Sequence, residues 1–129
     1  MNFVQECNCK IYERVSIKRS RIGRGVDINT NTYIENAFIW EDVQIAPNCS
    51  IVGVTHNFSR HGVSHEDHFS QIELETGVWV GAGAIILPGV TVGSHSVIAA
   101  GSIVNMDIPA HHRYVGVPLN NNFRLEEIK

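Results

Sequence analysis

Residues 74–109 read LETGVW VGAGAI ILPGVT VGSHSV IAAGSI VNMDIP, which are six consecutive blocks of six residues. Each block begins with Leu, Ile or Val, and its fifth position holds a small or aliphatic residue. A helix does not produce this period, because at about 100° per residue the sixth step ends about 240° around the axis. In a strand, positions one and five point to the same side. Each block therefore predicts a short strand with two inward side chains.

Turn-forming residues occupy the middle of these blocks. Glycine and proline gather at positions two to four, as in Gly81, Gly83, Pro88 and Gly89. Glycine tolerates the backbone geometry of a tight turn, and proline presets it. The segment therefore predicts a solenoid in which every hexad forms one strand and one turn.

The same frame extends upstream and then breaks. Earlier blocks begin at Ile22, Ile28, Ile34, Ile39, Ile45 and Ile51. The block at 34–38 is one residue short, which predicts a tightened turn, and Ile11 and Ile17 predict weak cap repeats. Between His56 and Glu73 the sequence turns polar and rich in histidine, which predicts a loop inserted into the solenoid. In the tail, FRLEEIK at 123–129 predicts a short helix over the open end.

Three hexads close one triangular coil, so the sequence predicts an all-β fold, a parallel β-helix built from hexapeptide repeats. General chirality rules favour right-handed crossovers, and the spacing by itself does not decide the hand. We expect a single domain over 1–129, with a cap at 1–21, coils at 22–56 and 74–109, an inserted loop at 57–73 and a tail at 110–129.

The composition supports this fold and excludes several function classes. Fifteen Ile and fifteen Val stand against four Leu, and β-branched residues favour strands. A formal net charge of −3 gives no general reason to expect nucleic acid, which binds basic surfaces. No apolar run approaches the roughly 18 residues of a membrane span, and the polar start lacks the apolar core of a secretion signal. We therefore expect a cytoplasmic protein with no membrane span and no nucleic-acid partner.

Cysteine and histidine spacing predicts no metal site. Cys7 and Cys9 form a C-x-C pair, but no second Cys or His pair lies at zinc-finger spacing, so we expect free thiols there. Cys49 occupies the small inward fifth position of its hexad, which predicts a core residue. Three more candidates, His61, His65 and His68, could bind a metal through neutral imidazoles, but we favour a polar, solvated loop.

The stretch 77–118, GVWVGAGAIILPGVTVGSHSVIAAGSIVNMDIPAHHRYVGVP, resembles the hexapeptide-repeat acetyltransferases. The resemblance covers about 22–118 and is to the maltose/galactoside-type and polysaccharide O-acetyltransferases in particular. It implies a left-handed parallel β-helix that assembles as a homotrimer. It also implies that acetyl-CoA binds between neighbouring subunits, and that an acetyl group passes to a hydroxyl of a sugar or polysaccharide precursor.

The segment IAPNCSIVGVTH at 45–56 resembles the family segment that delivers the catalytic histidine. Ile51, Gly53 and Thr55 share the inward parity, so His56 is expected to point outward where the loop departs. Acetyl transfer to a hydroxyl needs a base of near-neutral pKa, which histidine supplies. The imidazole also needs a partner that holds its tautomer, and Glu66, Asp67 and a backbone carbonyl are all candidates.

The resemblance assigns the donor side to small residues. Ala82 and Ala100 match family positions that contact acetyl-CoA, and small side chains suit a pantetheine arm that lies against the backbone. Asn105 and Met106 stand where many relatives have Thr-Lys near the phosphates, so one cation is missing. Arg113 or Arg124 are candidates to replace that cation.

The acceptor side is less sharply marked. INTNTYIEN at 28–36 resembles the region that supplies an Asn and an acid to the sugar, so Asn31 and Glu35 are candidates, although Asn is also a common turn residue. Trp79 matches the family's tryptophan and is either a substrate contact or a packing residue. The early cations attract an anionic acceptor or simply form a solvated face; they are Lys10, Arg14, Lys18, Arg19, Arg21 and Arg24.

Other functions remain open from the sequence. The acceptor could be an amino group of a nucleotide-linked sugar, or an antibiotic. A metal-dependent hydratase of the γ-carbonic-anhydrase kind uses the same solenoid but needs three converging histidines, and the repeats supply only His95. His111 and His112 follow the last hexad and are expected at the surface or near the donor. A scaffold without catalytic activity is a further alternative.

Overall fold

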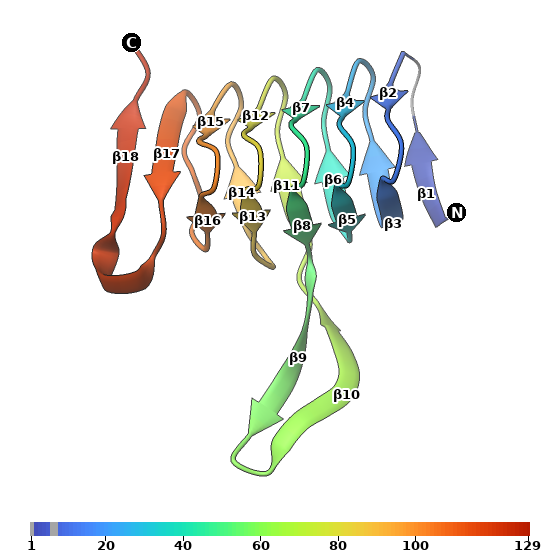
Figure 1. Ribbon diagram of the computed structural model, residues 1–129, viewed down its shortest axis with the longest axis vertical. Coiled ribbons are helices and arrows are strands. Elements are labelled where there is room, and N and C mark those ends of the chain that lie inside the picture. The colour runs from blue at the N-terminus through green and yellow to red at the C-terminus, as the bar shows by residue number, and fades with distance from the viewer. Residues whose placement is uncertain (1, 6–7) are drawn as a thin grey trace.

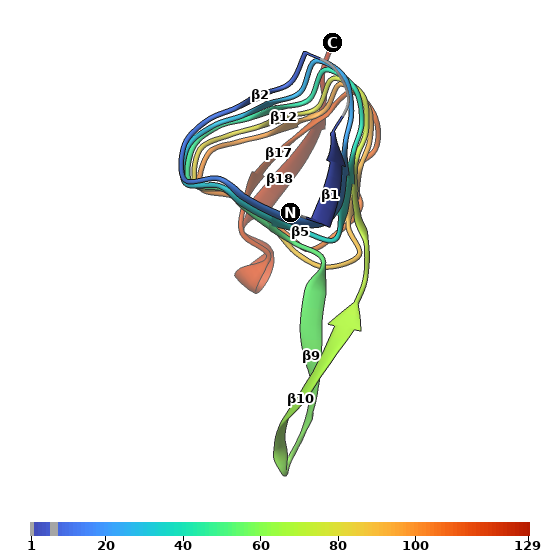
Figure 2. The same ribbon diagram turned by 90° about the vertical axis from the view of Figure 1, so that its right-hand side faces the viewer.

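The computed structural model describes residues 2–5 and 8–129. Cys7 lies outside this range, so the C-x-C pair is seen only through Cys9, whose thiol donates to the Gly23 carbonyl at 3.0 Å. The chain winds into a parallel β-solenoid of about six turns (Figure 1). Seen along the stack, the coils superpose as a triangle with one ribbon projecting from it (Figure 2). These features agree with the left-handed parallel β-helix that we expected.

The coils contribute short strands to three faces, and strands on a face pair in parallel with the same face of the next coil. Face 1 contains β2 (Lys10–Ile11), β4 (Asp27–Ile28), β7 (Gln44–Ile45), β12 (Trp79–Val80), β15 (Val97–Ile98) and β17 (His112–Gly116). Face 2 contains the first part of β3 (Ser16–Ile22), then β5 (Tyr33–Glu35), β8 (Ser50–Val52), β13 (Ile85–Ile86) and β16 (Ile103–Val104). Face 3 contains the second part of β3, then β6 (Ala37–Ile39), β11 (Ile72–Leu74) and β14 (Thr91–Val92). After β14, face 3 continues only as an isolated bridge between Val92 and Ile108. β1 (Asn2–Gln5) pairs with β3 at the N-terminal end.

The turns between faces stack into three corners, which we number by the face that precedes them. The first corner includes Asn31, Asn48, Gly83 and Gly101, and the third includes Asp42, Gly77, His95 and His111. All of these residues have positive φ, which explains the frequent Gly and Asn. The second corner follows face 2, and the projecting ribbon leaves from it.

The predicted inward positions of the regular hexads are confirmed. Every first position from Ile22 to Val104 is buried, and the core continues through the small fifth positions Cys49, Ser96 and Ser102. Identical positions stack on one another, as Ile28 pairs with Ile45 and Val80 with Ile98. The hydroxyl of Ser96 donates to the carbonyl of Pro109 at 2.7 Å, which satisfies a polar group inside the core.

The five-residue block at 34–38 forms a tightened turn at the second corner, as predicted. Asn36, with φ of 56°, turns the chain between β5 and β6, and Arg19, with φ of 51°, does the same one coil earlier. The cap repeats are real coils, because Ile17 is buried and β2 and β3 pair with the next turn.

The insertion is a β-ribbon and not the loop that we expected. β9 (Val54–Ser59) pairs antiparallel with β10 (Gly62–Phe69), and Thr55 is exposed instead of inward. The coil resumes at Ile72, two residues before the predicted boundary. Because most side chains on both faces of the ribbon are exposed, polar and apolar residues need not alternate, and the strand signal is absent from the sequence.

The predicted C-terminal helix is wrong. Phe123–Glu127 forms β18, which pairs antiparallel with β17 after a short 3₁₀ turn at Leu119–Asn121. Without β18, one edge of β17 would expose unpaired backbone N–H and C=O groups. The Phe123 ring also stacks on buried Tyr114, with ring centroids 5.5 Å apart. Strand pairing therefore overrides the local helix preference. In the part of the chain that the structure describes, no helix is long and apolar enough to cross a bilayer.

Candidate functional site

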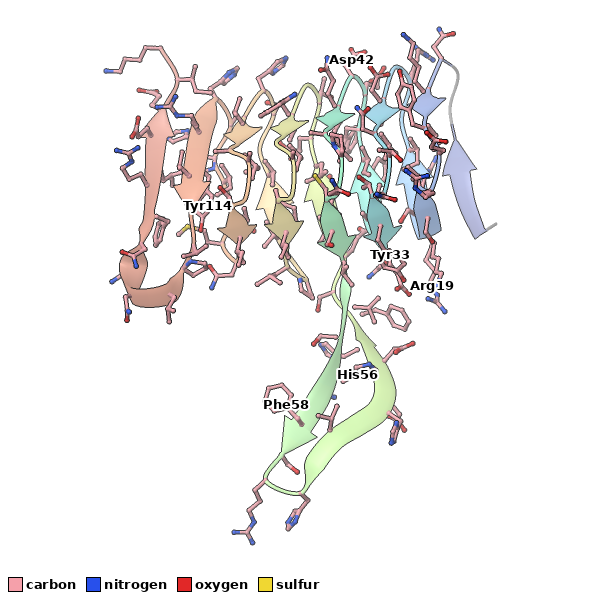
Figure 3. All side chains as sticks on the ribbon, viewed as in Figure 1. Arg19, Tyr33, Asp42, His56, Phe58 and Tyr114 are labelled. Atoms are coloured by element: carbon pink, nitrogen blue, oxygen red, sulfur yellow. The ribbon has the colours of Figure 1, made fainter. Side chains whose placement is uncertain are left out.

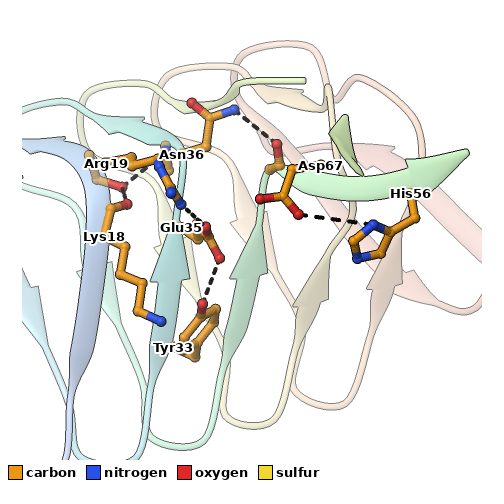
Figure 4. Close-up of polar contacts among 10 residues, drawn as sticks. Lys18, Arg19, Tyr33, Glu35, Asn36, His56 and Asp67 are labelled. Carbon is orange, nitrogen blue, oxygen red and sulfur yellow. Dashed lines mark hydrogen bonds and ion pairs between the residues drawn. The ribbon is translucent and has the colours of Figure 1, made fainter. Parts of the chain in front are cut away.

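His56 lies on β9, directly opposite Asp67 on β10. Its Nδ1 is 3.0 Å from the backbone carbonyl oxygen of Glu66 and 3.9 Å from Oδ1 of Asp67 (Figure 4). A carbonyl can only accept, so in the neutral ring Nδ1 carries the proton and Nε2 is the acceptor. The sequence left three candidates to orient the imidazole: Glu66, Asp67 and a backbone carbonyl. In the structure the hydrogen bond is made by the backbone carbonyl of Glu66, and the Asp67 carboxylate lies next to it.

The base of the ribbon is held at Gly53. Its N–H donates to the Glu35 carbonyl at 2.8 Å, and its own carbonyl accepts from the Asn36 side chain and from the Ser70 N–H, both at 2.9 Å. A Cβ at Gly53 would lie 2.4 Å from the Asn36 carbonyl oxygen, so glycine is required by close approach. The coil therefore orients a ribbon whose tip makes few contacts with it (Figure 3).

A linked set of polar groups lies on face 2 beside this base. The Tyr33 hydroxyl donates to Oε1 of Glu35 at 2.6 Å, and the other Glu35 oxygen accepts from the Arg19 guanidinium (Figure 4). The hydrogen bond to Glu35, with burial, raises the pKa of Tyr33 above its ordinary value. The Lys18 ammonium sits 5.4 Å from the centre of the Tyr33 ring. Both oxygens of the candidate acid Glu35 are therefore already engaged.

Sequence reasoning missed Tyr33 in this set and placed Arg19 only in a general basic run. A signal existed, because Tyr33 and Glu35 are two residues apart on one strand and must point to the same side. Asn31, the other acceptor candidate, lies at the first corner, where its side-chain oxygen accepts from Arg14 Nε at 2.9 Å. The structure thus separates Asn31 and Glu35 to opposite ends of face 2.

The residues that the sequence analysis assigned to acetyl-CoA lie in different parts of the fold. Ala82 and Ala100 lie on consecutive coils of the first corner, where the Gly101 N–H donates to the Ala82 carbonyl at 2.9 Å. A Cβ at Gly83 or Gly101 would meet nothing within 4 Å. On these two coils the first corner therefore carries only small side chains, which leaves room for an extended ligand chain to lie along the backbone.

The remaining candidates lie elsewhere. Asn105 and Met106 are at the second corner, and Met106 packs against the core. Arg124 is on β18, exposed, with its Nε 3.5 Å from Glu126. Trp79 is partly exposed on face 1, between Gln44 and Val97 of the adjacent coils.

The other histidines form no metal centre within one chain. His61, His65 and His68 are exposed along the ribbon. Among residues 2–5 and 8–129, no group of three or more His, Cys, Asp or Glu side chains could hold a metal ion. His95 and His111 stack at the third corner with ring centres 5.3 Å apart, because they occupy the same turn position one coil apart.

Comparison with known proteins agrees with this architecture. Residues 72–105 match the family described as "Bacterial transferase hexapeptide (six repeats)". The chain is 35% identical over 122 residues to the galactoside O-acetyltransferase of Lactococcus lactis subsp. lactis (strain IL1403), an alignment that covers 86% of this chain and 58% of that protein. The chain thus spans little more than half the length of this relative.

Two solved structures share the fold over almost the whole chain. A galactoside acetyltransferase in complex with coenzyme A superposes with a TM-score of 0.84 at 31% identity, covering 99% of this chain and 65% of that one. A hexapeptide-repeat-containing acetyltransferase from Vibrio cholerae O1 biovar eltor, complexed with acetyl coenzyme A, gives 0.85 at 27%, covering 98% and 71%. Repeat, fold and sequence agree, and the chain belongs to the hexapeptide-repeat acetyltransferase family.

Proposed function

We propose that this chain is an acetyl-CoA-dependent O-acetyltransferase that acts on a sugar hydroxyl, with His56 as general base. The observation that carries the proposal is the held imidazole: Nδ1 is 3.0 Å from a carbonyl oxygen, which leaves Nε2 to accept a proton. The relatives support the donor and the acceptor class, because one is named a galactoside O-acetyltransferase and two solved neighbours carry coenzyme A or acetyl coenzyme A.

His56 would move one proton twice. As the acceptor oxygen bonds to the acetyl carbon, Nε2 takes the hydroxyl proton, and as the C–S bond breaks, the imidazolium returns that proton to the leaving sulfur. The Glu66 carbonyl keeps the ring in the required tautomer throughout. Asp67, 3.9 Å from Nδ1, favours the transient positive charge on the ring. No covalent acyl-enzyme is required.

The donor fits the first corner of the solenoid. Ala82, Gly83, Ala100 and Gly101 carry little or no side chain there, and added Cβ atoms at the two glycines would occupy open space. An extended pantetheine chain could lie against these backbone groups and hydrogen-bond to them. With Asn105 and Met106 at the second corner, the exposed Arg124 on β18 is the candidate cation for the phosphates.

The active unit in this proposal is a homotrimer. The ribbon strand β9, which carries His56, projects from the second corner, whereas Ala82 and Ala100 lie at the first corner of the same chain. A neighbouring copy would bring its first corner to the ribbon and complete the site. Phe58 and Val63, which are 78% and 62% exposed on the ribbon, supply apolar surface for that contact.

The test is release of the coenzyme A thiol from acetyl-CoA over a panel of galactosides, maltose and nucleotide sugars. His56→Gln should lower kcat at least about a hundredfold while the trimer mass, measured by light scattering, stays unchanged. His61→Gln, at the tip of the same ribbon, is the matched control and should stay within twofold. A loss below fivefold in trimeric His56→Gln contradicts the general-base role, and mild loss with amino sugars would indicate N-acetylation instead.

A further inference from the structure

A row of arginine and aromatic side chains runs from the ribbon base along face 3 toward the third corner. The Arg19 guanidinium lies 5.2 Å from the Phe69 ring centre, and that of Arg21 lies 5.4 Å from the Phe38 ring centre. A third pair, Arg24 and Trp40, lines one hollow. We call the set the arginine–aromatic strip; it comprises Arg19, Arg21, Arg24, Phe38, Trp40 and Phe69.

The register of the coils places this strip on the surface. Arg21, Phe38 and Glu73 are aligned neighbours on β3, β6 and β11, and they point outward because Ile22, Ile39 and Leu74 point inward. These strands run from the ribbon base toward the third corner (Figure 1). The strip therefore begins beside the ribbon that carries His56 and ends at Trp40.

The aromatic end of the strip is held in place. The rings of Phe38 and Trp40 stack with centres 4.6 Å apart, and the Trp40 Nε1–H donates to the Glu73 carboxylate at 2.6 Å. Trp40 still exposes 38% of its surface. The hollow against it, about 220 Å³, is smaller than the roughly 300–1,000 Å³ of clefts that enclose a whole small molecule. It therefore suits one ring of a longer ligand.

The charges along the strip are mixed. Arg19 pairs with Glu35, Arg24 lies 3.9 Å from Glu41, and Glu73 accepts from Trp40. Neighbouring donors and acceptors suit hydroxyl groups, which do both. The exposed part of the Trp40 ring, which lines the hollow, suits the apolar face of a sugar ring. A nucleic acid would instead require a clear excess of cations.

We propose that the arginine–aromatic strip binds a saccharide chain, one end of which reaches the ribbon base. The strip runs from Phe69 at the ribbon base past Phe38 to Trp40, so it presents several aromatic rings in succession, and the ligand is an oligosaccharide or polysaccharide. Binding by the strip is independent of acetyl transfer. Its role as the acceptor's holding site rests on the proposed function.

The experiment measures retention of the full-length protein on an array of neutral and acidic oligosaccharides of six or more rings, with oligo(dT) as the nucleic-acid probe. Wild type should bind at least one saccharide, and Trp40→Ala should weaken that binding about tenfold or more. Tyr12→Ala, which removes an exposed aromatic ring from the first corner, should leave it within twofold. Absence of saccharide binding by wild type, or preferential binding of oligo(dT), overturns the proposal.

Two further variants keep the outcome clear. If Trp40→Ala lowers the melting temperature, the exposed Arg24→Ala carries the test and should weaken binding about threefold. His56→Gln should bind the same saccharide as wild type. A wild-type protein that transfers acetyl groups but binds no saccharide refutes the strip, whereas a wild-type protein that binds saccharide but transfers no acetyl group refutes the proposed function. With a long acceptor, Trp40→Ala should raise KM about tenfold and leave a monosaccharide acceptor within twofold.

Discussion

The solenoid and the β9–β10 ribbon are both made of short strands, yet they are held together by different forces. In the coils, aligned side chains such as Ile28 and Ile45 are fully buried against each other. In the ribbon, His56, Phe58 and Val63 are exposed, and backbone pairing holds the two strands together. An isolated two-stranded hairpin is marginally stable in water. Stability therefore resides in the coils, and the ribbon can carry reactive groups without being part of the core.

This contrast predicts which kind of damage each substitution causes. Changes in the coils should reduce the free energy of unfolding first and activity only as a consequence. Changes in the ribbon should reduce activity while the fold persists. The following predictions test that division in order of decreasing effect.

Ile45→Asp should have the largest effect. It places a charge at the centre of the stack, where Ile45 is fully buried between Ile28 and Val80. The expected loss is about 5 kcal/mol or more, enough to unfold a small domain. Circular dichroism and urea titration would measure it. Gln44→Asp, the outward neighbour on the same strand, should remain folded; equal behaviour of the two variants would contradict the assigned burial.

Gly53→Ala should damage the junction between the two regions. The added Cβ would lie 2.4 Å from the Asn36 carbonyl oxygen and 2.9 Å from that of Ser70. Backbone must shift to relieve this contact, at a cost of about 2–3 kcal/mol. Urea titration measures the loss, with Thr55→Ala in the ribbon as a control expected within about 0.5 kcal/mol. A Gly53→Ala protein as stable as wild type would show that the junction is not rigid.

Asp67→Asn should reduce activity moderately and leave stability unchanged. Oδ1 of Asp67 is 3.9 Å from Nδ1 of His56, and both side chains are partly exposed. An exposed pair contributes about 0.2–1 kcal/mol, so kcat should fall about two- to fivefold. Acetyl-CoA turnover would measure this, with His68→Gln on the same strand as the neutral control. A hundredfold loss would mean that Asp67, and not the Glu66 carbonyl, is the main partner of His56.

The smallest expected effect is the contribution of Tyr33 to the pH dependence of the free energy of unfolding. The hydrogen bond to Glu35 raises the pKa of Tyr33, so in the folded state the hydroxyl keeps its proton where an unfolded tyrosine, with a pKa near 10, loses it. The folded state then binds more protons, and stability must fall as pH rises above about 10. Urea titrations would measure the free energy of unfolding of wild type and of Tyr33→Phe between pH 8 and 10.5. The difference between the two proteins should stay constant up to about pH 10 and become smaller above it. A difference that already falls between pH 8 and 9 contradicts the raised pKa.

The coils were predictable because their rule is local and repeated. Each inward residue, such as Ile51 or Leu74, meets the same position of the next coil, so one period specifies the packing of the whole stack. The tightened corner at Asn36 also followed, because a missing residue must be absorbed by the turn. The donor candidates Ala82 and Ala100 came from the resemblance, and they stay predictions.

The ends and the insertion were less predictable because their structure depends on distant partners. Phe123–Glu127 has helix-compatible residues, but the open edge of β17 recruits it as a strand. The ribbon has no core face, so no hydrophobic alternation marked it. Arg19 joins Tyr33 and Glu35 because β3 and β5 align across coils, a relation that no short window of sequence contains.

The sequence by itself determined the hexapeptide solenoid and the inward residues of its regular coils. It did so because burial of aliphatic side chains at a fixed period of six fixes which side chains point inward and align between coils. The tertiary structure alone decided that the insertion is a ribbon, that the Glu66 carbonyl holds the imidazole, and that arginines from one coil meet aromatic rings from the next. These contacts join segments that pairing between coils brings together, and hydrogen bonds between such segments leave no periodic mark in the chain.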